Sequence, residues 1–210
     1  MNTYAKADSA IRAMNRQNLK AFNRLKLIDY DELNVIRWVS DTYDASVALA
    51  KKRYQEVAFE AYIAALIEAK TAEAVASGMA DDEITTDWVL DMLEEVDPVT
   101  LYAFLPETDR KKQRLIEALA VAQNKNAEID KALRYWAKQT GQYAINSVDR
   151  ARIDAFKAIG VKRVMWNTAD DERVCEDCHQ LDGQIFDIDK VPPKPHWGCR
   201  CWITPFGSEL

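Results

Sequence analysis

All four cysteines and both histidines of this 210-residue chain lie in one stretch near its C-terminus, CEDCHQLDGQIFDIDKVPPKPHWGCRCW. They form a Cys175-x2-Cys178-His179 group and, after sixteen residues, a His196-x2-Cys199-x-Cys201 group. In a Cys-x2-Cys turn two thiolates converge on one ion, and a second ligand pair across a hairpin completes a tetrahedron. Tetrahedral sites rich in thiolates select zinc. The spacing therefore predicts a zinc site in this stretch.

Two sets of ligands for this site remain open. The first set is Cys175, Cys178, Cys199 and Cys201, with His196 as a hydrogen-bonding neighbour of the ligands. In the second set His196 replaces Cys201, because a Cys-x-Cys in a regular strand sends its side chains to opposite faces. A bend at Arg200 would bring both sulfurs to the ion, and we favour the four-cysteine set on that basis.

The expected role of the metal is structural. A catalytic zinc usually has three protein ligands, an open position for water and a general base nearby. Here four or five ligands crowd together, no His-Glu-x-x-His motif occurs, and Glu176 and Asp177 are typical of solvated loop acids. A redox couple of Cys175 and Cys178 would need a thioredoxin-like βαβ context that the chain lacks. We expect His179 to be exposed or to cap a helix. We therefore expect no enzymatic activity, with a zinc-dependent hydrolase or nuclease as a weaker alternative.

The composition is that of an ordinary soluble globular protein, with 48% hydrophobic and 30% charged residues. The N-terminus lacks the apolar region of a secretory signal. The longest apolar stretches fall short of the roughly 20 residues that a membrane-spanning helix needs. We therefore expect no membrane association and a reducing cytoplasm, where close cysteine pairs bind metals more often than they form disulfides.

Long helices are predicted for the first part of the chain. The first 97 residues contain no proline and one glycine, Gly78, and both residue types break helix interiors. The pattern predicts helices over residues 3–26 and 31–77, the second roughly 65–70 Å long and ended by Gly78. A seven-residue repeat indicates a coiled-coil-like seam; it is formed by Ile36, Tyr43, Ala50, Val57 and Ala64, with Val47, Tyr54 and Ala61 in companion positions. A domain of this size needs no such rod for its own core, so the helix is either broken along its length or spans a larger assembly.

Shorter elements are predicted for the rest. Helices are expected over residues 85–96, 108–124, 127–140 and 142–159, with Gly141 and Gly160 as terminators of the last two. Short strands are then expected at VKRVMW, after the hairpin-favouring Asp182-Gly183, and at CRCWITPF. So few strands cannot support their own core, so a staple is expected.

The predicted fold class is therefore mainly α with a small zinc-stabilised β-hairpin knob. We divide the chain into an elongated helical region (residues 1–106), a helical lead-in (107–160) and the C-terminal knob (161–210).

The charge is unevenly distributed. The chain carries a net charge of −6, yet residues 107–163 hold 13 basic and 7 acidic side chains. This segment could meet DNA or an acidic partner protein. We favour the simpler interpretation, in which these are solvated helix faces that pair with acidic neighbours.

Two stretches near the C-terminus, VMWNTADDERVCEDCHQLDGQIF and PPKPHWGCRC, together resemble the C-terminal signature of the minor head, or head morphogenesis, proteins of tailed bacteriophages (the Mu F-like family). The matching positions are Trp166, residues 170–173, Cys175, Cys178, residues 181–183, Pro195, His196, Cys199, Arg200 and Cys201. The helical approach from about Glu107 also resembles the family's lead-in. The first hundred residues carry no motif that we can match.

The resemblance implies a virion protein, present in few copies at the portal vertex or the inner capsid surface and made in the host cytoplasm. Its implied roles are head morphogenesis, DNA packaging or genome ejection. Its implied partners are the portal protein and other head proteins, with packaged DNA and further copies of the chain as additional candidates. Arg173 and Arg200, which flank cysteines, would anchor the knob to local carboxylates or contact DNA phosphate, and we favour anchoring. The alternative function is a DNA-binding module that uses residues 107–163 and the knob.

Overall fold

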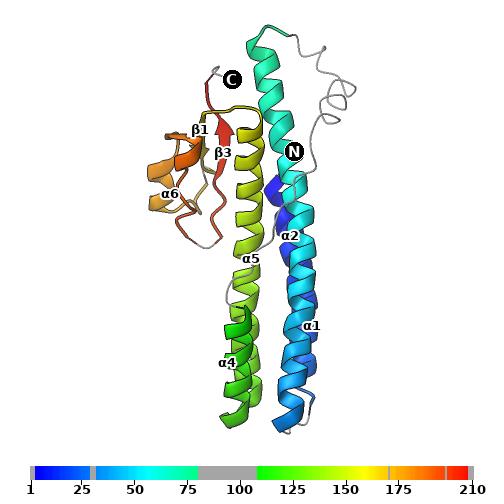
Figure 1. Cartoon of the computed structure of the whole chain (residues 1–210). Helices are drawn as coiled ribbons and strands as arrows, with labels where there is room; N and C mark the ends of the chain where they lie inside the picture. The colour runs from blue at the N-terminus through cyan, green and yellow to red at the C-terminus, as the bar shows by residue number, and fades with distance from the viewer. Residues whose placement is uncertain (1–2, 29–31, 80–107, 170, 197, 208–210) are drawn as a thin grey trace. The chain divides into compact units, whose positions relative to one another are not determined.

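The structure is a computed structural model that describes residues 3–28, 32–79, 108–169, 171–196 and 198–207. The described chain is mainly helical, with a small antiparallel sheet near the C-terminus, as predicted (Figure 1). The helix predicted at residues 85–96 lies outside the described residues. Among the described helices, none combines the length and hydropathy needed to cross a bilayer.

The elements follow in the order α1 (Thr3–Leu25), α2 (Glu32–Ala76), α4 (Thr108–Val121), α5 (Lys125–Ala158), β1 (Arg163–Asn167), α6 (Glu176–Leu181), β2 (Ile185–Asp187), the 3-10 turn η1 (Ile188–Lys190) and β3 (Trp202–Pro205). The long helices predicted at residues 3–26 and 31–77 are confirmed.

The chain forms two compact units, each built from segments that are distant in sequence. The helical unit consists of Ala5–Val57 and Tyr102–Ile145. The knob unit consists of Met1–Tyr4, Ala58–Leu101 and Asn146–Leu210, and it contains the C-terminal knob. The division of the chain at residues 106 and 160 stays a prediction.

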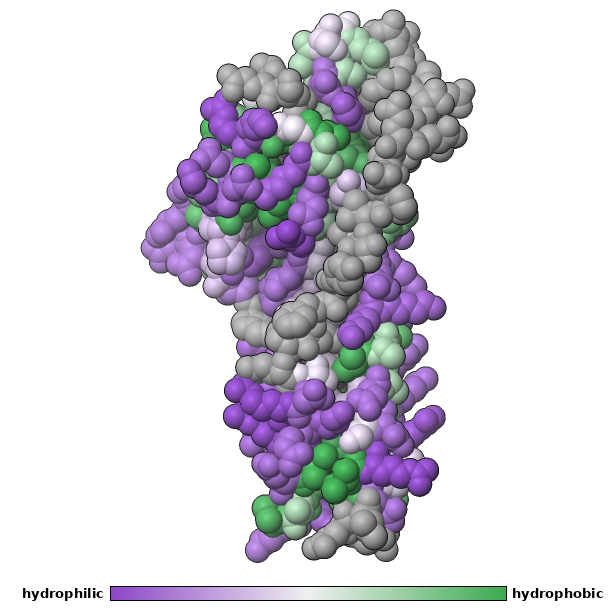
Figure 2. Space-filling model, viewed as in Figure 1, coloured by the Kyte–Doolittle hydropathy of each residue, from purple (hydrophilic) through white to green (hydrophobic). Residues whose placement is uncertain are grey.

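Aromatic rings form the core of the helical unit. The ring of Tyr43 on α2 packs edge-on against Phe22 of α1 and Trp136 of α5, with 5.4 Å between centroids in each pair. Leu119 of α4 is fully buried in the same cluster. On the face seen in Figure 2, hydrophilic side chains (purple) cover most of the described surface and hydrophobic ones form small patches. The amphipathic helices thus turn their apolar faces inward.

The predicted seven-residue repeat of α2 is confirmed in part, because Tyr43, Ala50, Val57, Tyr54 and Ala61 are buried. An eleven-residue repeat describes the buried seam over a longer stretch. This repeat, with recurring spacings of four, four and three, is formed by Val35, Val39, Tyr43, Ser46, Ala50, Tyr54, Val57, Ala61 and Ala65. In the second half of the helix Ala58, Tyr62, Leu66, Ala69 and Ala74 are buried beside it. Ile36, the first position of the predicted repeat, is 55% exposed. A seven-residue repeat stays on one face only if the helix winds at 3.5 residues per turn. The eleven-residue repeat corresponds to about 3.67 per turn, close to an unstrained helix.

Gly141 does not end a helix, contrary to the prediction, because α5 continues through it from Lys125 to Ala158. Neighbouring contacts hold the backbone helical here: the Tyr54 hydroxyl donates to the carbonyl of Thr140 at 2.9 Å, and Ala144 is fully buried. Tertiary packing thus outweighs the weak helix propensity of one glycine.

Gly78 and Gly160 do end helices, as predicted. Both have positive φ, 89° and 84°. The amides of Gly160 and Val161 donate back to the carbonyls of Lys157 and Phe156, at 3.1 and 3.0 Å. This is the Schellman arrangement, and the same pair of bonds closes α2.

The sheet has the strand order β2-β1-β3, with both neighbours antiparallel to the central β1. Three strands therefore form where two or three were expected. The predicted hairpin is corrected in one respect: α6 is inserted between β1 and β2, so these strands are not joined by a tight turn. Asp182 and Gly183 lead out of α6, and the Gly183 amide donates to the Trp166 carbonyl at 2.8 Å.

We predict that Gly141→Ala stabilises the protein by up to about 1 kcal/mol, because glycine costs about that much in a helix interior. A Cβ at this position would meet the Ile11 side chain at 3.6 Å, an ordinary contact. Thermal unfolding of the full chain measures the effect. Gly160→Ala is the control and should destabilise, because its φ of 84° disfavours any side chain. If both variants lost stability equally, the account of Gly141 would be wrong.

Candidate metal centre

The first pair of cysteines is positioned by the start of α6. Cys175 is the N-cap residue of this helix, with extended backbone angles and no side-chain capping bond, so its thiol is free to point elsewhere. Its carbonyl accepts the first helical bond, from the His179 amide at 3.0 Å. Cys178 lies three residues on, and residues at that spacing share one face of a helix. The short helix therefore brings the two thiols together.

The second group comes from the segment that leads into β3. Gly198 has a φ of 74°, a left-handed conformation that glycine adopts without strain. Cys199 and Cys201 precede the first strand residue, Trp202, so they are not in a regular strand. Their sulfurs and that of Cys178 all lie within 4.8 Å of one another. The objection that a Cys-x-Cys must split across two faces therefore does not apply here.

Cys178 stands at the centre of the cluster. Its sulfur lies 3.6 Å from the Cys199 sulfur and 3.2 Å from Nε2 of His196. Cys175, Cys178 and His196 form a second group whose ligand atoms lie within 4.8 Å of one another. Sulfur ligands at about 2.3 Å from a tetrahedral ion are roughly 3.8 Å apart. The chemistry of the donor set thus fits a zinc ion, and the spacing fits it within each group of three. Because the two groups share Cys178, both predicted ligand sets remain open.

Burial gives these thiols an unusual environment. Cys178, Cys199 and Cys201 are 2%, 1% and 3% exposed, and none of the four cysteines is in a disulfide. Burial raises the pKa of the Cys178 thiol, and hydrogen bonds among the cysteines raise it further. Burial raises the pKa of Cys199 as well. Thiols must lose their protons to ligate a metal, so a bound cation would supply the charge that keeps them ionised.

Asp171, in the loop before α6, forms ion pairs with two arginines. Arg200 forms a two-pronged ion pair with Asp171, with contacts of 2.7 and 2.5 Å. The Arg200 guanidinium is the main reason that the pKa of Asp171 lies well below its usual range. The Arg173 amide donates to the same carboxylate at 3.0 Å, and its guanidinium lies 3.6 Å away. Both arginines flanking the cysteines thus meet a local carboxylate.

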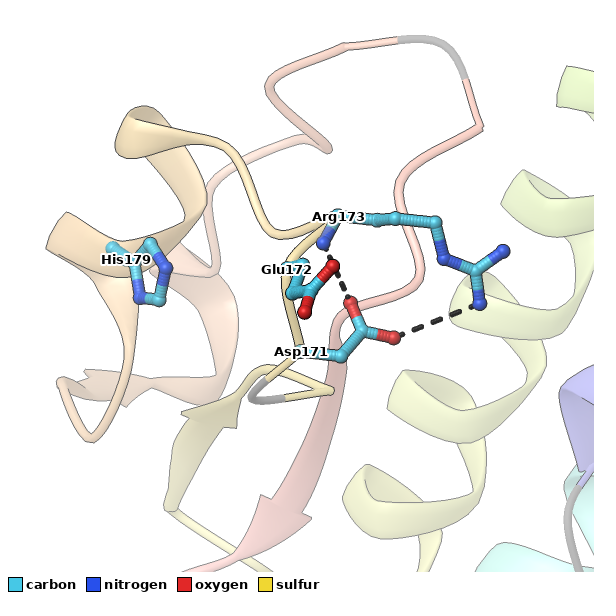
Figure 3. A pocket seen from close by; sticks show the side chains of 4 residues that line it. All are labelled: Asp171, Glu172, Arg173 and His179. Carbon is cyan, nitrogen blue, oxygen red and sulfur yellow. Dashed lines mark hydrogen bonds and ion pairs between the residues drawn. The ribbon is translucent and has the colours of Figure 1, made fainter.

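A shallow surface depression lies beside this loop. It is lined by Asp171, Glu172, Arg173 and His179 (Figure 3). In the close-up the His179 ring projects from α6, apart from the three side chains of the loop. His179 belongs to neither group of potential metal ligands found among the described residues.

Two buried cations hold the knob, and neither was singled out from the sequence. Arg152 of α5 is 4% exposed. It donates to the Ile203 carbonyl of β3 at 2.8 Å and to Glu68 of α2 at 2.6 Å. The sequence did contain a signal for Arg152: it stands three residues after Asp149, so two opposite charges fall on one face of the predicted helix.

Lys194 connects the metal loop itself to α5. Its ammonium pairs with Asp149 at 3.4 Å and donates to the Cys201 carbonyl. It also lies 5.2 Å from the ring centre of Tyr4 and 5.3 Å from that of Trp166. Burial raises the pKa of Asp149, while the charge of Lys194 acts in the opposite direction. The lysine between two prolines of the signature thus fixes the ligand loop to the helix.

We predict that Arg152→Met destabilises the protein by about 2–3 kcal/mol, because it removes the partner of a buried carbonyl and of Glu68. Urea unfolding of the full chain measures the loss. Arg150→Met is the matched control: that side chain is 72% exposed and pairs with Asp154, so its loss should cost under about 0.5 kcal/mol. Similar losses for the two variants would contradict a role of Arg152 in holding β3.

One comparison with known proteins identifies a relationship. The model of the family described as Phage Mu protein F like protein matches residues 65–204, which is 140 of the 210 residues. The matched region runs from the second half of α2 through β3 and includes every candidate ligand. No curated protein and no solved structure matches the chain.

Proposed function

This chain belongs to the Phage Mu protein F like family, a family of phage head proteins, and we propose that it is a structural minor head protein. The proposed place of action is the portal vertex or the inner capsid surface. There it would serve head morphogenesis, DNA packaging or genome ejection. The observation that carries the proposal is the family match, because it spans the complete cysteine cluster and the helices that hold it.

The proposed cofactor is one structural zinc ion. Cys175, Cys178, Cys199 and Cys201 would hold it, with His196 as the alternative to Cys201. The support is the set of unpaired, mostly buried thiols whose sulfurs converge on Cys178. Such an ion would cross-link α6 to the segment before β3 and so stabilise a sheet that is too small to fold alone.

A structural role fits the coordination better than a hydrolytic one. A hydrolytic ion needs an open position for water. Here two groups of three ligand atoms, Cys175, Cys178 and His196, and Cys178, Cys199 and Cys201, share the Cys178 sulfur, so protein ligands alone could fill a tetrahedral shell. The knob would then act as a rigid docking piece, since Arg152 and Lys194 tie it to α5.

We predict that freshly purified, reduced protein contains stoichiometric zinc and that Cys178→Ser abolishes it. The sulfur of Cys178 belongs to both groups of candidate ligands, so neither ligand set survives its removal. Elemental analysis measures the metal, and limited proteolysis should show a loosened C-terminus while the helical circular dichroism signal persists. His179→Ala is the neighbouring control and should keep the metal.

The same assay distinguishes the two ligand sets. If the four cysteines ligate, Cys201→Ser should lose the metal, and His196→Ala should weaken binding by about 10–100-fold, as loss of a ligand's hydrogen-bonding neighbour does. The reverse order would assign the fourth position to His196. Parent protein without stoichiometric metal would contradict the zinc site altogether.

Association with heads is tested separately. We predict that the full chain co-purifies with heads assembled together with the portal protein, and that Cys178→Ser reduces this association by loosening the docking piece. Sedimentation of assembled heads followed by quantification of the chain measures it. Heads assembled without portal protein are the control. Undiminished association with those heads would contradict attachment at the portal vertex.

A further inference from the structure

The helical unit carries a large excess of positive charge. Its described residues include 18 lysines and arginines against 9 aspartates and glutamates. The chain as a whole has a net charge of −6, so sequence totals hide this excess. Screening at physiological salt limits charge interactions to about 8 Å. A ligand at this surface would therefore meet the local positive charge and not the net charge of the chain.

The most regular part of this charge is a row on α1, formed by Arg12, Arg16, Lys20 and Arg24. All four side chains are exposed. They recur every four residues, so they follow one side of the helix over about 18 Å at 1.5 Å per residue. The buried residues of α1 that face the core, such as Met14 and Phe22, lie on the opposite side of the helix. We call these four residues the α1 row.

Within the described part of the chain, none of the four side chains of the α1 row forms an ion pair. In the predicted basic segment at 107–163, by contrast, Lys112, Lys131, Arg150, Arg152 and Lys157 are each paired with a carboxylate. These contacts fit our favoured interpretation of that segment. Lys51 and Lys52 of α2, Arg114 of α4 and Arg134 of α5 are exposed and form no ion pair either. What sets the α1 row apart is its regularity, because it places four such charges along one side of a single helix.

We propose that the α1 row binds the phosphate backbone of duplex DNA without reading base sequence. Phosphate contacts by lysine and arginine supply most of non-specific DNA affinity. A row of about 18 Å runs beside roughly five base pairs at 3.4 Å each. The geometry favours DNA over a protein partner, because protein interfaces centre on buried aromatic and apolar side chains. Among the described residues of α1, Leu19 is the one exposed large hydrophobic side chain.

This inference goes beyond the proposed structural role and needs no metal. It concerns a face of the helical unit, whereas the proposed zinc ion and its ligands belong to the knob unit. It also names a surface different from residues 107–163 and the knob, which the sequence suggested for DNA.

The test measures binding of the full chain to a 30-base-pair duplex of arbitrary sequence, by fluorescence anisotropy over a series of salt concentrations. The variant combines Arg12→Gln, Arg16→Gln, Lys20→Gln and Arg24→Gln. The control combines Lys70→Gln, Arg150→Gln, Lys157→Gln and Lys190→Gln, which removes the same charge from paired cations of the knob unit. Circular dichroism checks that both variants remain folded.

The parent should bind with an affinity that falls steeply with salt, equally for unrelated sequences. The α1 variant should flatten the slope of log affinity against log salt by about 3–4, because each phosphate contact contributes about 0.9. The control should keep the parent slope. Absence of binding by the parent at 50 mM salt, or equal flattening in both variants, would overturn the proposal.

An α1 variant that binds DNA like the parent but no longer joins purified heads would also overturn it, in favour of an acidic protein partner. Zinc content and head association, measured on the same variants, report separately on the proposed structural role. Failure of DNA binding alone would therefore leave that role standing.

Discussion

The Cys178 sulfur lies 3.2 Å from the His196 imidazole and 3.6 Å from the Cys199 sulfur, and the arrangement of the C-terminal knob depends on this convergence. It joins the first turn of α6 to the segment that precedes β3, which is 21 residues further along the chain. The sheet between them has strands of five, three and four residues. Strands this short bury too little apolar surface to hold a unique arrangement alone. A metal ion held by these thiols, as we propose, would add a cross-link to the small core that Val164, Trp166 and Ile203 form.

The knob is also held from the outside by buried charge. Arg152 reaches the backbone of β3, and Lys194 reaches the carbonyl of Cys201 while pairing with Asp149. Buried charges are costly unless they are paired and hydrogen-bonded, and these are both. Directional contacts of this kind specify where a small sheet sits on a helix. The loop that carries the candidate ligands Cys199 and Cys201 is therefore positioned by α5.

The buried seam of α2 shows how this long helix packs against its neighbours. Its eleven-residue repeat includes small residues such as Ala50 and Ala61, which are 1% and 0% exposed. Small side chains let neighbouring helices approach closely. The eleven-residue repeat keeps the buried side chains on one face of α2 without a left-handed supercoil. The helix α2 contributes to both units: its residues up to Val57 belong to the helical unit and those from Ala58 on to the knob unit. The family match begins in this second part, at residue 65.

Local sequence determined the helices, the central strand and the first cysteine pair of this protein. The absence of proline and glycine is enough to predict α2 to within one residue at each end. The alternating residues after Gly160 predict β1, and the Cys-x2-Cys spacing predicts a pair of converging thiols, because helix and turn geometry is set by neighbours in the chain. The Mu F-like signature likewise lies in the sequence itself, and the family match confirms it.

Only the tertiary structure decided the rest, because it depends on which distant residues meet. Gly141 continues a helix since Tyr54 and other residues pack around it. The position of Cys201 beside Cys178 depends on how the last strand joins the sheet. Arg152 became an anchor and the α1 row became an unpaired cationic face through contacts made, or not made, with other helices. The positions of these cations along their helices can be read from the sequence, but the distant partners that they meet or do not meet depend on how the helices pack.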